Sequence, residues 1–212
     1  MTGGPPESPV IEGLRSLEVR WIFPGQLEAA VERWFGRFPA AIQTRQDTYL
    51  LHPPLHELSV KVRGSRALEV KVYGGSPGIL QVPGRARGHM ESWQKWSFPC
   101  SLPSPDIPDT GGWRPVRKRR RISWFSPASG QMAARAPGLG RQPQCEVELT
   151  EVHTSSGHWW TLGLEATGVV GMLPGTLEAA AALVFAHALP EGVEPGLDQS
   201  RSYAQWLGQR PG

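Results

Sequence analysis

Short runs of alternating apolar and polar residues recur along the chain and predict β-strands. The first run combines three apolar and three polar residues in strict alternation: Ser16, Leu17, Glu18, Val19, Arg20 and Trp21. Successive side chains of a strand point to opposite faces, so each run separates an apolar from a polar face. The same alternation occurs at 57–63, 67–73, 94–98, 146–150 and 160–165. The pattern predicts a sheet with one apolar face and one unusually charged face.

Helical spacing occurs in three places. Residues 25–37 carry apolar side chains at i, i+3, i+4, i+7 and i+8, which predicts a helix that ends before Pro39. A second helix is predicted over about 174–188 and a short third helix around 199–208. We expect all three helices to cover the apolar outer face of the sheet.

Glycine and proline divide the chain without splitting it into several domains. The 212 residues contain 25 Gly and 21 Pro, a content that argues against a helical bundle. Residues 1–13 are predicted to form a flexible tail, and residues 14–212 a single domain with long loops near 74–92, 99–115 and 126–144.

The composition of the chain also predicts its cellular location and the charge of its binding partners. No stretch offers the roughly 20 apolar residues of a membrane-spanning helix, and the N-terminus lacks the pattern of a secretory signal. With only Cys100 and Cys145, the chain has no disulfide framework, so we expect a cytoplasmic protein with no membrane partner. A net charge of +3 favours anionic partners.

Acidic and basic residues recur at alternate positions on the predicted polar faces. The basic ones are Arg20, Lys61, Arg63, Lys71 and Lys95, and the acidic ones are Glu18, Glu69, Glu146, Glu148 and Glu165. One interpretation is the ordinary solvated face of an antiparallel sheet. If the sheet instead closes into a barrel with its apolar face outward, these side chains converge in a polar tunnel. Such a tunnel would bind a polyanion through Arg and Lys, and Mg²⁺ through carboxylate oxygens.

Several segments, in chain order, resemble the CYTH domains, which are triphosphate tunnel metalloenzymes. The early segments are Arg45-Gln46-Asp47-Thr48-Tyr49-Leu50, Leu58 to Arg63 and Leu68-Glu69-Val70-Lys71. Val116 to Arg120 is similar to the family's Lys-x-Arg strand, Cys145 to Leu149 to its acidic strand, and Trp160 to Glu165 to its last Glu-bearing strand. Ser202 to Leu207 resembles the Ser-Tyr helix that often ends these domains.

Two strands depart from the family pattern. The N-terminal Glu-x-Glu-x-Lys signature has Ser16 for its first Glu and Arg20 for its Lys, and Gly163 stands where the last strand tends to have a Glu. Because a hard-cation site depends on the number of carboxylate oxygens, these losses should lower metal affinity.

The resemblance implies an α+β fold with a tunnel of about eight antiparallel strands and dependence on Mg²⁺ or Mn²⁺. It implies hydrolysis of inorganic triphosphate, thiamine triphosphate or a nucleoside triphosphate, and some family members instead cyclise ATP. The implied metal ligands are Glu18, Glu146, Glu148 and Glu165. The implied phosphate contacts, with Lys95 added from the charge pattern, are Arg20, Lys61, Arg63, Lys71, Lys95, Lys118 and Arg120. No general base is identifiable.

Other functions stay open at this point. A degenerate, non-catalytic polyphosphate- or nucleotide-binding module fits Ser16 and Gly163, and a nucleic-acid-binding β protein would use the basic run 117–121. That run has no neighbouring aromatic residues on which bases could stack, so a nucleic acid is a less favoured ligand than a small phosphate compound. Its register is also open: resemblance favours Lys118 and Arg120 on the tunnel face, whereas parity with apolar neighbours favours the odd-numbered arginines: Arg117, Arg119 and Arg121.

A few isolated residues have plain interpretations. His52 and His56 flank two prolines and predict a turn, and neither cysteine has the surroundings of a nucleophile. Trp159 shares its parity with Glu165 and is a candidate to line the tunnel and stack on a base.

Overall fold

The computed structural model describes residues 13–51, 57–64, 66–99, 112–136 and 142–209. Its strands are β1 (Leu14–Pro24), β2 (Ala41–Leu50), β3 (Leu58–Arg63), β4 (Ala67–Tyr73), β5 (Gly78–Val82), β6 (Ala86–Pro99), β7 (Trp113–Ser126), β8 (Gln131–Ala133), β9 (Gln144–Thr154) and β10 (Gly157–Thr167). Its helices are α1 (Ala29–Phe35), α2 (Leu173–Val184) and α3 (Tyr203–Gly208), with a 3₁₀ turn at Val170–Met172.

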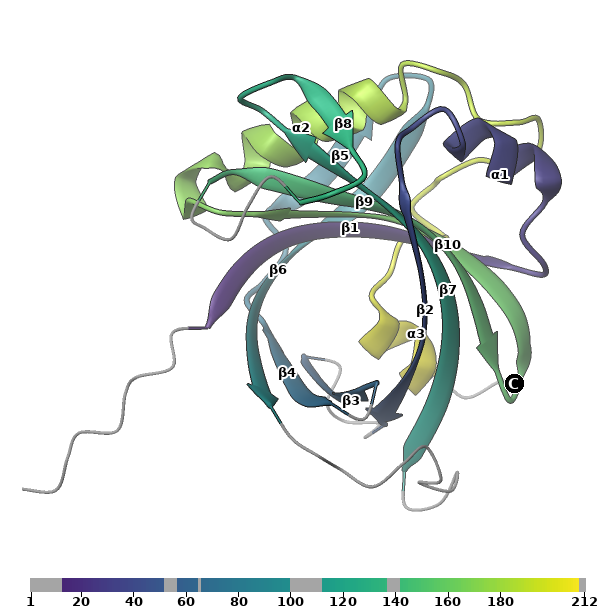
Figure 1. Ribbon diagram of the computed structural model, residues 1–212, viewed down its shortest axis with the longest axis vertical. Helices are drawn as coiled ribbons and strands as arrows, with labels where there is room; N and C mark the ends of the chain where they lie inside the picture. The colour runs from purple at the N-terminus through teal and green to yellow at the C-terminus, as the bar shows by residue number, and fades with distance from the viewer. Residues whose placement is uncertain (1–12, 52–56, 65, 100–111, 137–141, 210–212) are drawn as a thin grey trace, which may run out of the picture.

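Eight of these strands form a closed antiparallel barrel. Their order is β1-β10-β9-β7-β2-β3-β4-β6, and β1 also pairs with β6, which joins the two ends of the sheet. Strands β5 and β8 lie outside the ring, paired with β6 and β7. Figure 1 looks down the bore. The predicted α+β fold with an eight-stranded tunnel is therefore confirmed.

The apolar face of the barrel points outward on one side, as the alternation predicts. Leu17, Val19 and Trp21 of β1 are buried in the main core together with α1 and α2. Helix α2 packs against β10, β1, β9 and β5, and α1 contributes Val31, Trp34 and Phe35. Each of these side chains leaves water on folding, which supplies the hydrophobic stabilisation of this wall.

The third helix does not cover the outer face, and that prediction is wrong. Leu207 of α3 is buried with Tyr49, Val116 and Val152, and Val116 shares the strand face of Lys118. Figure 1 shows α3 inside the ring of strands. The amphipathic spacing identified the helix, but it could not distinguish an outer cover from a plug in the bore.

The predicted loop 74–92 is also wrong, because it contains β5 and the first part of β6. In the first part of β6 the positions that face the core are Ala86, Gly88 and Met90, and the small Ala86 and Gly88 hide the alternation. The predicted loop 126–144 includes the short strand β8, and residues 100–111 of the third predicted loop lie outside the described part. The predicted tail is likewise undescribed except for Gly13.

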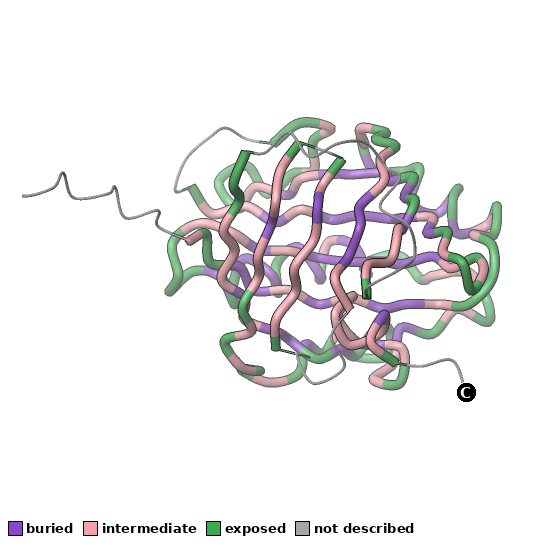
Figure 2. The backbone as a smooth tube through the Cα atoms, turned by 90° about the horizontal axis from the view of Figure 1, so that it is seen from below, coloured by how far each residue is buried: buried purple, intermediate pink, exposed green. Residues whose placement is uncertain are grey.

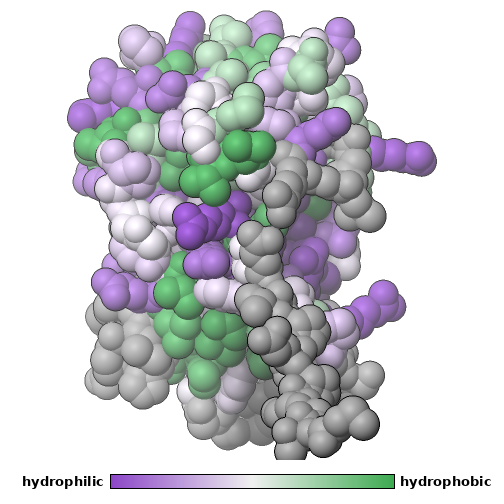
Figure 3. All heavy atoms as spheres, turned by 90° about the vertical axis from the view of Figure 1, so that its left-hand side faces the viewer, coloured by the Kyte–Doolittle hydropathy of each residue, from purple (hydrophilic) through white to green (hydrophobic). Residues whose placement is uncertain are grey.

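The wall formed by β3 and β4 has no helix over it in the described part of the chain. Most of its residues are of intermediate burial, as the near strands of Figure 2 show. Val72 and Phe98 expose 40% and 37% of their surface, and Figure 3 shows apolar and polar patches side by side on the neighbouring face. Within the described residues, no helix has the length and apolar character needed to cross a membrane.

Candidate functional site in the barrel

Two adjoining cavities form one tunnel through the barrel. The inner cavity, of about 90 Å³, reaches α3, and the mouth cavity, of about 210 Å³, reaches Leu14 and Arg63. Five residues line both cavities: Arg45, Lys61, Lys71, Arg120 and Glu165. Nine Lys or Arg side chains and six Glu side chains line the two together, so the tunnel is net positive.

Strand pairing places four carboxylates in one row across the barrel wall. Glu18 lies opposite Glu91 of β6 on one side and Glu165 of β10 on the other, and Glu165 lies opposite Glu146 of β9. Glu91 accepts a hydrogen bond of 2.9 Å from the Trp93 indole, and burial, followed by repulsion from Glu18, raises the pKa of Glu91. Neighbouring carboxylates repel one another unless cations lie between them, so the row concentrates negative potential at one place.

Arg20 extends from β1 across β10 to reach Glu148 of β9. It passes over Gly163, where an added Cβ would come within 2.8 Å of the Arg20 guanidinium. The missing side chain at 163 therefore provides the space that Arg20 occupies. Ser16, at the other departure from the family pattern, donates a hydrogen bond of 2.6 Å to Glu18.

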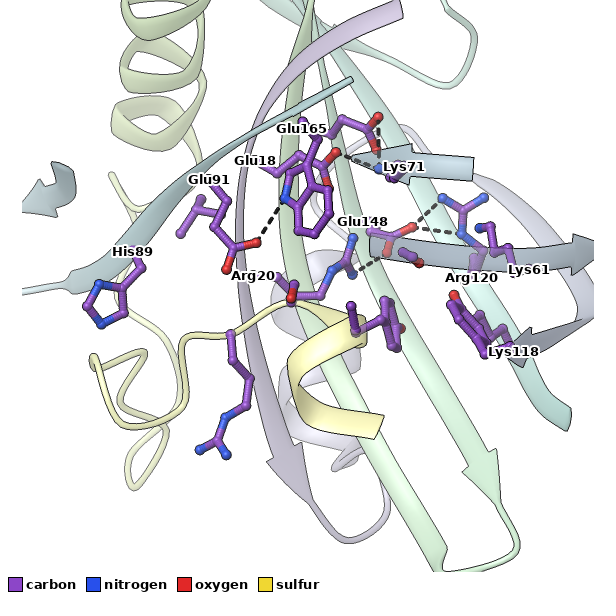
Figure 4. Close-up of a pocket in the computed structure, with 18 of the residues that line it drawn as sticks. Glu18, Arg20, Lys61, Lys71, His89, Glu91, Lys118, Arg120, Glu148 and Glu165 are labelled. Atoms are coloured by element: carbon purple, nitrogen blue, oxygen red, sulfur yellow. Dashed lines mark hydrogen bonds and ion pairs between the residues drawn. The ribbon is translucent and has the colours of Figure 1, made fainter. Parts of the chain in front are cut away.

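Arg120 connects two carboxylates of the acidic strand. Its guanidinium pairs with Glu148 and lies 2.5 Å from Glu146, and it also donates to Gln43 at 2.9 Å. Burial alone would raise the pKa of Glu148, but Arg120 and Arg20 outweigh it and hold that pKa well below its ordinary value. The pKa of Glu146 is raised by burial and by its acidic neighbours in spite of Arg120. Figure 4 shows Arg20, Glu148 and Arg120 directed toward one another.

Lys71 and Lys95 neutralise the middle of the carboxylate row. The Lys71 ammonium lies 2.5 Å from Glu18 and 3.7 Å from Glu165 (Figure 4). Lys95 lies 3.7 Å from Glu165. Although burial opposes it, the two lysines lower the pKa of Glu165 to about 2. Burial would lower the pKa of Lys71, yet Glu165 and Glu18 raise it, so Lys71 stays charged.

A second cluster surrounds Asp47, which is fully buried. Arg45 lies 3.1 Å, Lys118 3.3 Å and Lys61 3.5 Å from its carboxylate. These cations outweigh the effect of burial and lower the pKa of Asp47. Three basic side chains around one carboxylate leave hydrogen-bond donors available for an anion in the tunnel.

Lys118 lines the inner cavity next to α3, between two tyrosines. It donates to the Tyr49 hydroxyl at 2.7 Å and lies 3.7 Å from the centre of the Tyr203 ring. Burial, only partly offset by Asp47, lowers the pKa of Lys118 well below its ordinary value. A phosphate nearby would favour the charged form again, so anion binding and protonation of Lys118 are coupled.

At the mouth, Glu69 pairs with Arg63 at 2.8 Å and with Lys61 at 3.0 Å. Burial would raise the pKa of Glu69, but Lys61 and Arg63 lower it to about 2. The mouth therefore keeps an ionised carboxylate beside two cations.

These lowered pKa values predict acid sensitivity. A carboxyl group whose folded-state pKa lies below its unfolded value stabilises the fold above the unfolded value, and this contribution is lost as pH falls through the folded value. The free energy of unfolding should therefore fall between pH 4.5 and 2, by about 3 kcal/mol for Glu69, and Glu165 should contribute in the same direction. Denaturant titrations across this range measure it. The Glu69→Gln variant should show a shallower fall, and a pH-independent wild type would contradict the assignment.

The structure shows which residues of the basic run 117–121 face the tunnel and which face outward. Lys118 and Arg120 line the tunnel, as the resemblance suggests, and Arg117, Arg119 and Arg121 face outward. Arg119 pairs with Glu151 at 2.8 Å, and Arg121 pairs with Glu151 at 3.0 Å and with Glu32. Acidic partners thus offset two of the three outward arginines, which weakens the case for a nucleic-acid surface.

All predicted site residues come together in the tunnel, although their roles stay predictions. The seven predicted phosphate contacts and the four predicted metal ligands line one cavity or the other. Sequence reasoning missed Arg45, Asp47, Tyr49, Glu91 and Tyr203. The signal for Arg45 and Asp47 was their i, i+2 spacing, but the sequence of β2 lacks alternating apolar residues. Tyr203 lay in the segment that resembles the Ser-Tyr helix, but its place in the tunnel depends on the placement of α3, and Glu91 lies in the missed start of β6.

Trp159 does not line either tunnel cavity. Its ring packs against Trp206 of α3, 5.2 Å between centres, so the helix covers it. Cys145 is fully buried and its thiol pKa is raised by burial, consistent with an inert side chain. Cys100, His52 and His56 lie outside the described residues.

The donor chemistry of the carboxylate row suits a hard cation such as Mg²⁺ or Mn²⁺. Within the described residues, however, no three His, Cys, Asp or Glu side chains converge as a ready-made metal site. Mg²⁺ commonly uses one or two carboxylates together with substrate phosphates and water. Glu18 and Glu165, opposite each other on β1 and β10, fit a metal ion that enters with a phosphate.

Comparisons with known proteins return solved structures only. No protein-family model matches the sequence, and no curated protein matches it either. A conserved hypothetical protein from Pyrococcus furiosus is 14% identical with a TM-score of 0.44, over 89% of this chain and 98% of that one. A Pyrococcus horikoshii protein is 14% identical with a TM-score of 0.47, over 91% and 97%.

A third structure is the S. pombe Pct1 RNA triphosphatase in complex with the Spt5 CTD. It is 11% identical with a TM-score of 0.41, over 84% of this chain and 82% of that one. Similarity at this level carries no weight for function, which has to be inferred from the tunnel itself.

Proposed function

We propose that this protein is a divergent CYTH-like triphosphatase, which binds a triphosphate-containing small molecule in its tunnel and hydrolyses it with Mg²⁺ or Mn²⁺. The observation that carries the proposal is the convergence of basic side chains from separate strands on one enclosed bore. Arg45, Lys61, Lys71 and Arg120 lie where the two cavities meet. An extended anion at that junction would contact four cations contributed by four strands.

The charge balance of the bore suits a triphosphate. Such a molecule carries about four negative charges and needs several Arg or Lys donors around it, since charge-assisted hydrogen bonds are the strong ones. In the free protein these donors are held by carboxylates such as Glu18 and Glu148. Phosphate oxygens would take over some of these contacts, and the carboxylates released would be available to a divalent cation.

Hydrolysis in such a site depends on positioning and charge neutralisation. Lys71 and Arg120 would orient the phosphates along the bore, and Arg20, fixed by Glu148, would add positive charge at the inner end. A divalent cation, when bound by Glu18 and Glu165, would neutralise the negative phosphate charge that is not balanced by the Lys and Arg side chains. Packing of Tyr49, Tyr203 and Leu207 where α3 enters the bore limits water on that side of the inner cavity.

A second candidate is a binding module without catalysis, and the geometry of Arg20 favours it. The Arg20 guanidinium fills the space above Gly163, where the family tends to have a carboxylate. A fixed cation there retains affinity for phosphate but supplies no metal ligand. The two candidates differ in turnover, not in binding.

Phosphate release separates them. Purified protein is incubated with Mg²⁺ or Mn²⁺ and inorganic triphosphate, thiamine triphosphate or ATP, beside a Lys61→Ala plus Arg63→Ala variant. Release by the wild type at least 10-fold above the variant is expected, since two charged contacts of about 1.5–3 kcal/mol each are lost. Tight calorimetric binding without release identifies the binding module, and absence of both binding and release contradicts the proposal.

A further inference from the structure

One tryptophan of the tunnel wall is packed unlike the others. Trp124 lies on the tunnel face of β7, four residues beyond Arg120, and lines the mouth cavity. It belongs to neither buried apolar cluster and makes no ring–ring contact within the described residues, whereas Trp93, which lines the inner cavity, is buried with its ring centre 5.2 Å from that of Tyr73. A half-buried indole among charged side chains offers a flat surface for another ring.

A side-chain amide lies next to this indole. Gln144 of β9 lines the same cavity, and its Oε1 is buried without a hydrogen-bond partner among the described residues. Glu146 is the direct cross-strand neighbour of Trp124, so Gln144, two residues earlier, is a diagonal neighbour on the same face. Diagonal neighbours lie about 7–8 Å apart, within reach of aromatic and long side chains. A buried acceptor without a donor is unfavourable, and a ligand N–H would satisfy it.

We propose that Trp124 and Gln144 form a binding site for a flat heterocycle that carries an amino group, attached to the triphosphate in the tunnel. The ring stacks on the Trp124 indole, and its amino group donates to Gln144 Oε1. The site rests on the proposed function, because the triphosphate holds the ring at the mouth. Adenine in ATP and the aminopyrimidine of thiamine triphosphate share this chemistry.

The spacing along β7 supports this arrangement. Four residues of a strand span about 13 Å, so a ring at Trp124 lies two side-chain layers outside the phosphate contact at Arg120, with Ile122 between them. The Arg63 side chain lines the same cavity as Trp124 and is 40% exposed, so this end of the tunnel is open to solvent. The phosphates would therefore enter first, and the ring would stay at the mouth.

Calorimetry without divalent cation, which prevents turnover, tests the site. ATP should bind the wild type about 10-fold more tightly than purine riboside triphosphate, which carries a hydrogen in place of the amino group, because the Gln144 oxygen is then left unpaired. Gln144→Leu should remove this difference. Trp124→Leu should weaken ATP about 10-fold, as stacking is worth about 1–3 kcal/mol, and leave inorganic triphosphate within twofold. Trp113→Leu, on the same strand but lining neither tunnel cavity, is the matched control.

Binding of inorganic triphosphate distinguishes failure of the ring site from failure of the proposed function, and it also shows that each variant is folded. If it binds but Trp124→Leu and Gln144→Leu leave ATP and thiamine triphosphate unchanged, the ring site is refuted and the proposed function stands. If it fails to bind the wild type, the proposed function falls and the ring site with it. A loss confined to thiamine triphosphate or to ATP supports the site and identifies which ring it takes.

Discussion

Replacing Arg120 by Ala should lower the free energy of unfolding by about 3–5 kcal/mol, the cost of breaking a buried ion pair on one side only. The Arg120 side chain is 8% exposed and pairs with both Glu146 and Glu148. Without it, two buried carboxylates have one guanidinium fewer to offset their desolvation and mutual repulsion. Denaturant titration at pH 7 measures the change.

Arg119 provides the matched control one position away. Its side chain faces outward, is 46% exposed and pairs with Glu151. Arg119→Ala should cost less than about 1 kcal/mol, because exposed ion pairs contribute little. Equal, small effects of the two substitutions would show that Arg120 is not held in a closed bore.

Replacing Lys71 by Ala should weaken the binding of inorganic triphosphate about 10- to 100-fold. A hydrogen bond to a charged group is worth about 1.5–3 kcal/mol, and 1.4 kcal/mol corresponds to a factor of ten. Lys71 lines both cavities, and its removal leaves Glu18 and Glu165 with less positive charge to offset their repulsion of the phosphates. Calorimetry with the intact protein gives the affinity, and Lys71→Arg should retain most of it.

Arg117→Ala is the control for charge alone. Arg117 is exposed on the outer face of β7, so its loss reduces the net charge equally without touching the tunnel. Triphosphate affinity should stay within twofold. A comparable loss in both variants would place the anion on the outside of the barrel.

The alternation predicted the strands and most of the charged lining, because side chains of a strand alternate between its two faces, whereas closure of the sheet into a barrel was predicted from the resemblance. Lys61 and Lys71 sit in runs where every second residue is apolar, and β-strand geometry then assigns each side chain to a face. The register of β7 could not be settled this way, because Lys118 and Arg120 share their parity with Ile122 and Trp124. Cross-strand neighbours decided it.

Features that depend on three-dimensional packing escaped the sequence. Asp47 lies in a strand without alternation, and Tyr203 reaches Lys118 only because α3 enters the bore. Gly163 looked like a simple loss of a carboxylate, yet it provides the space for Arg20. Such substitutions are interpretable only once the neighbouring side chain is known.

A crystal structure with Mg²⁺ and a non-hydrolysable triphosphate tests the central claim most directly. The account predicts phosphate density at the junction of the two cavities, within hydrogen-bond distance of Lys61, Lys71 and Arg120. Density confined to Arg117 and Arg119 on the outer wall, or an unchanged set of ion pairs in the bore at saturating ligand, would contradict it.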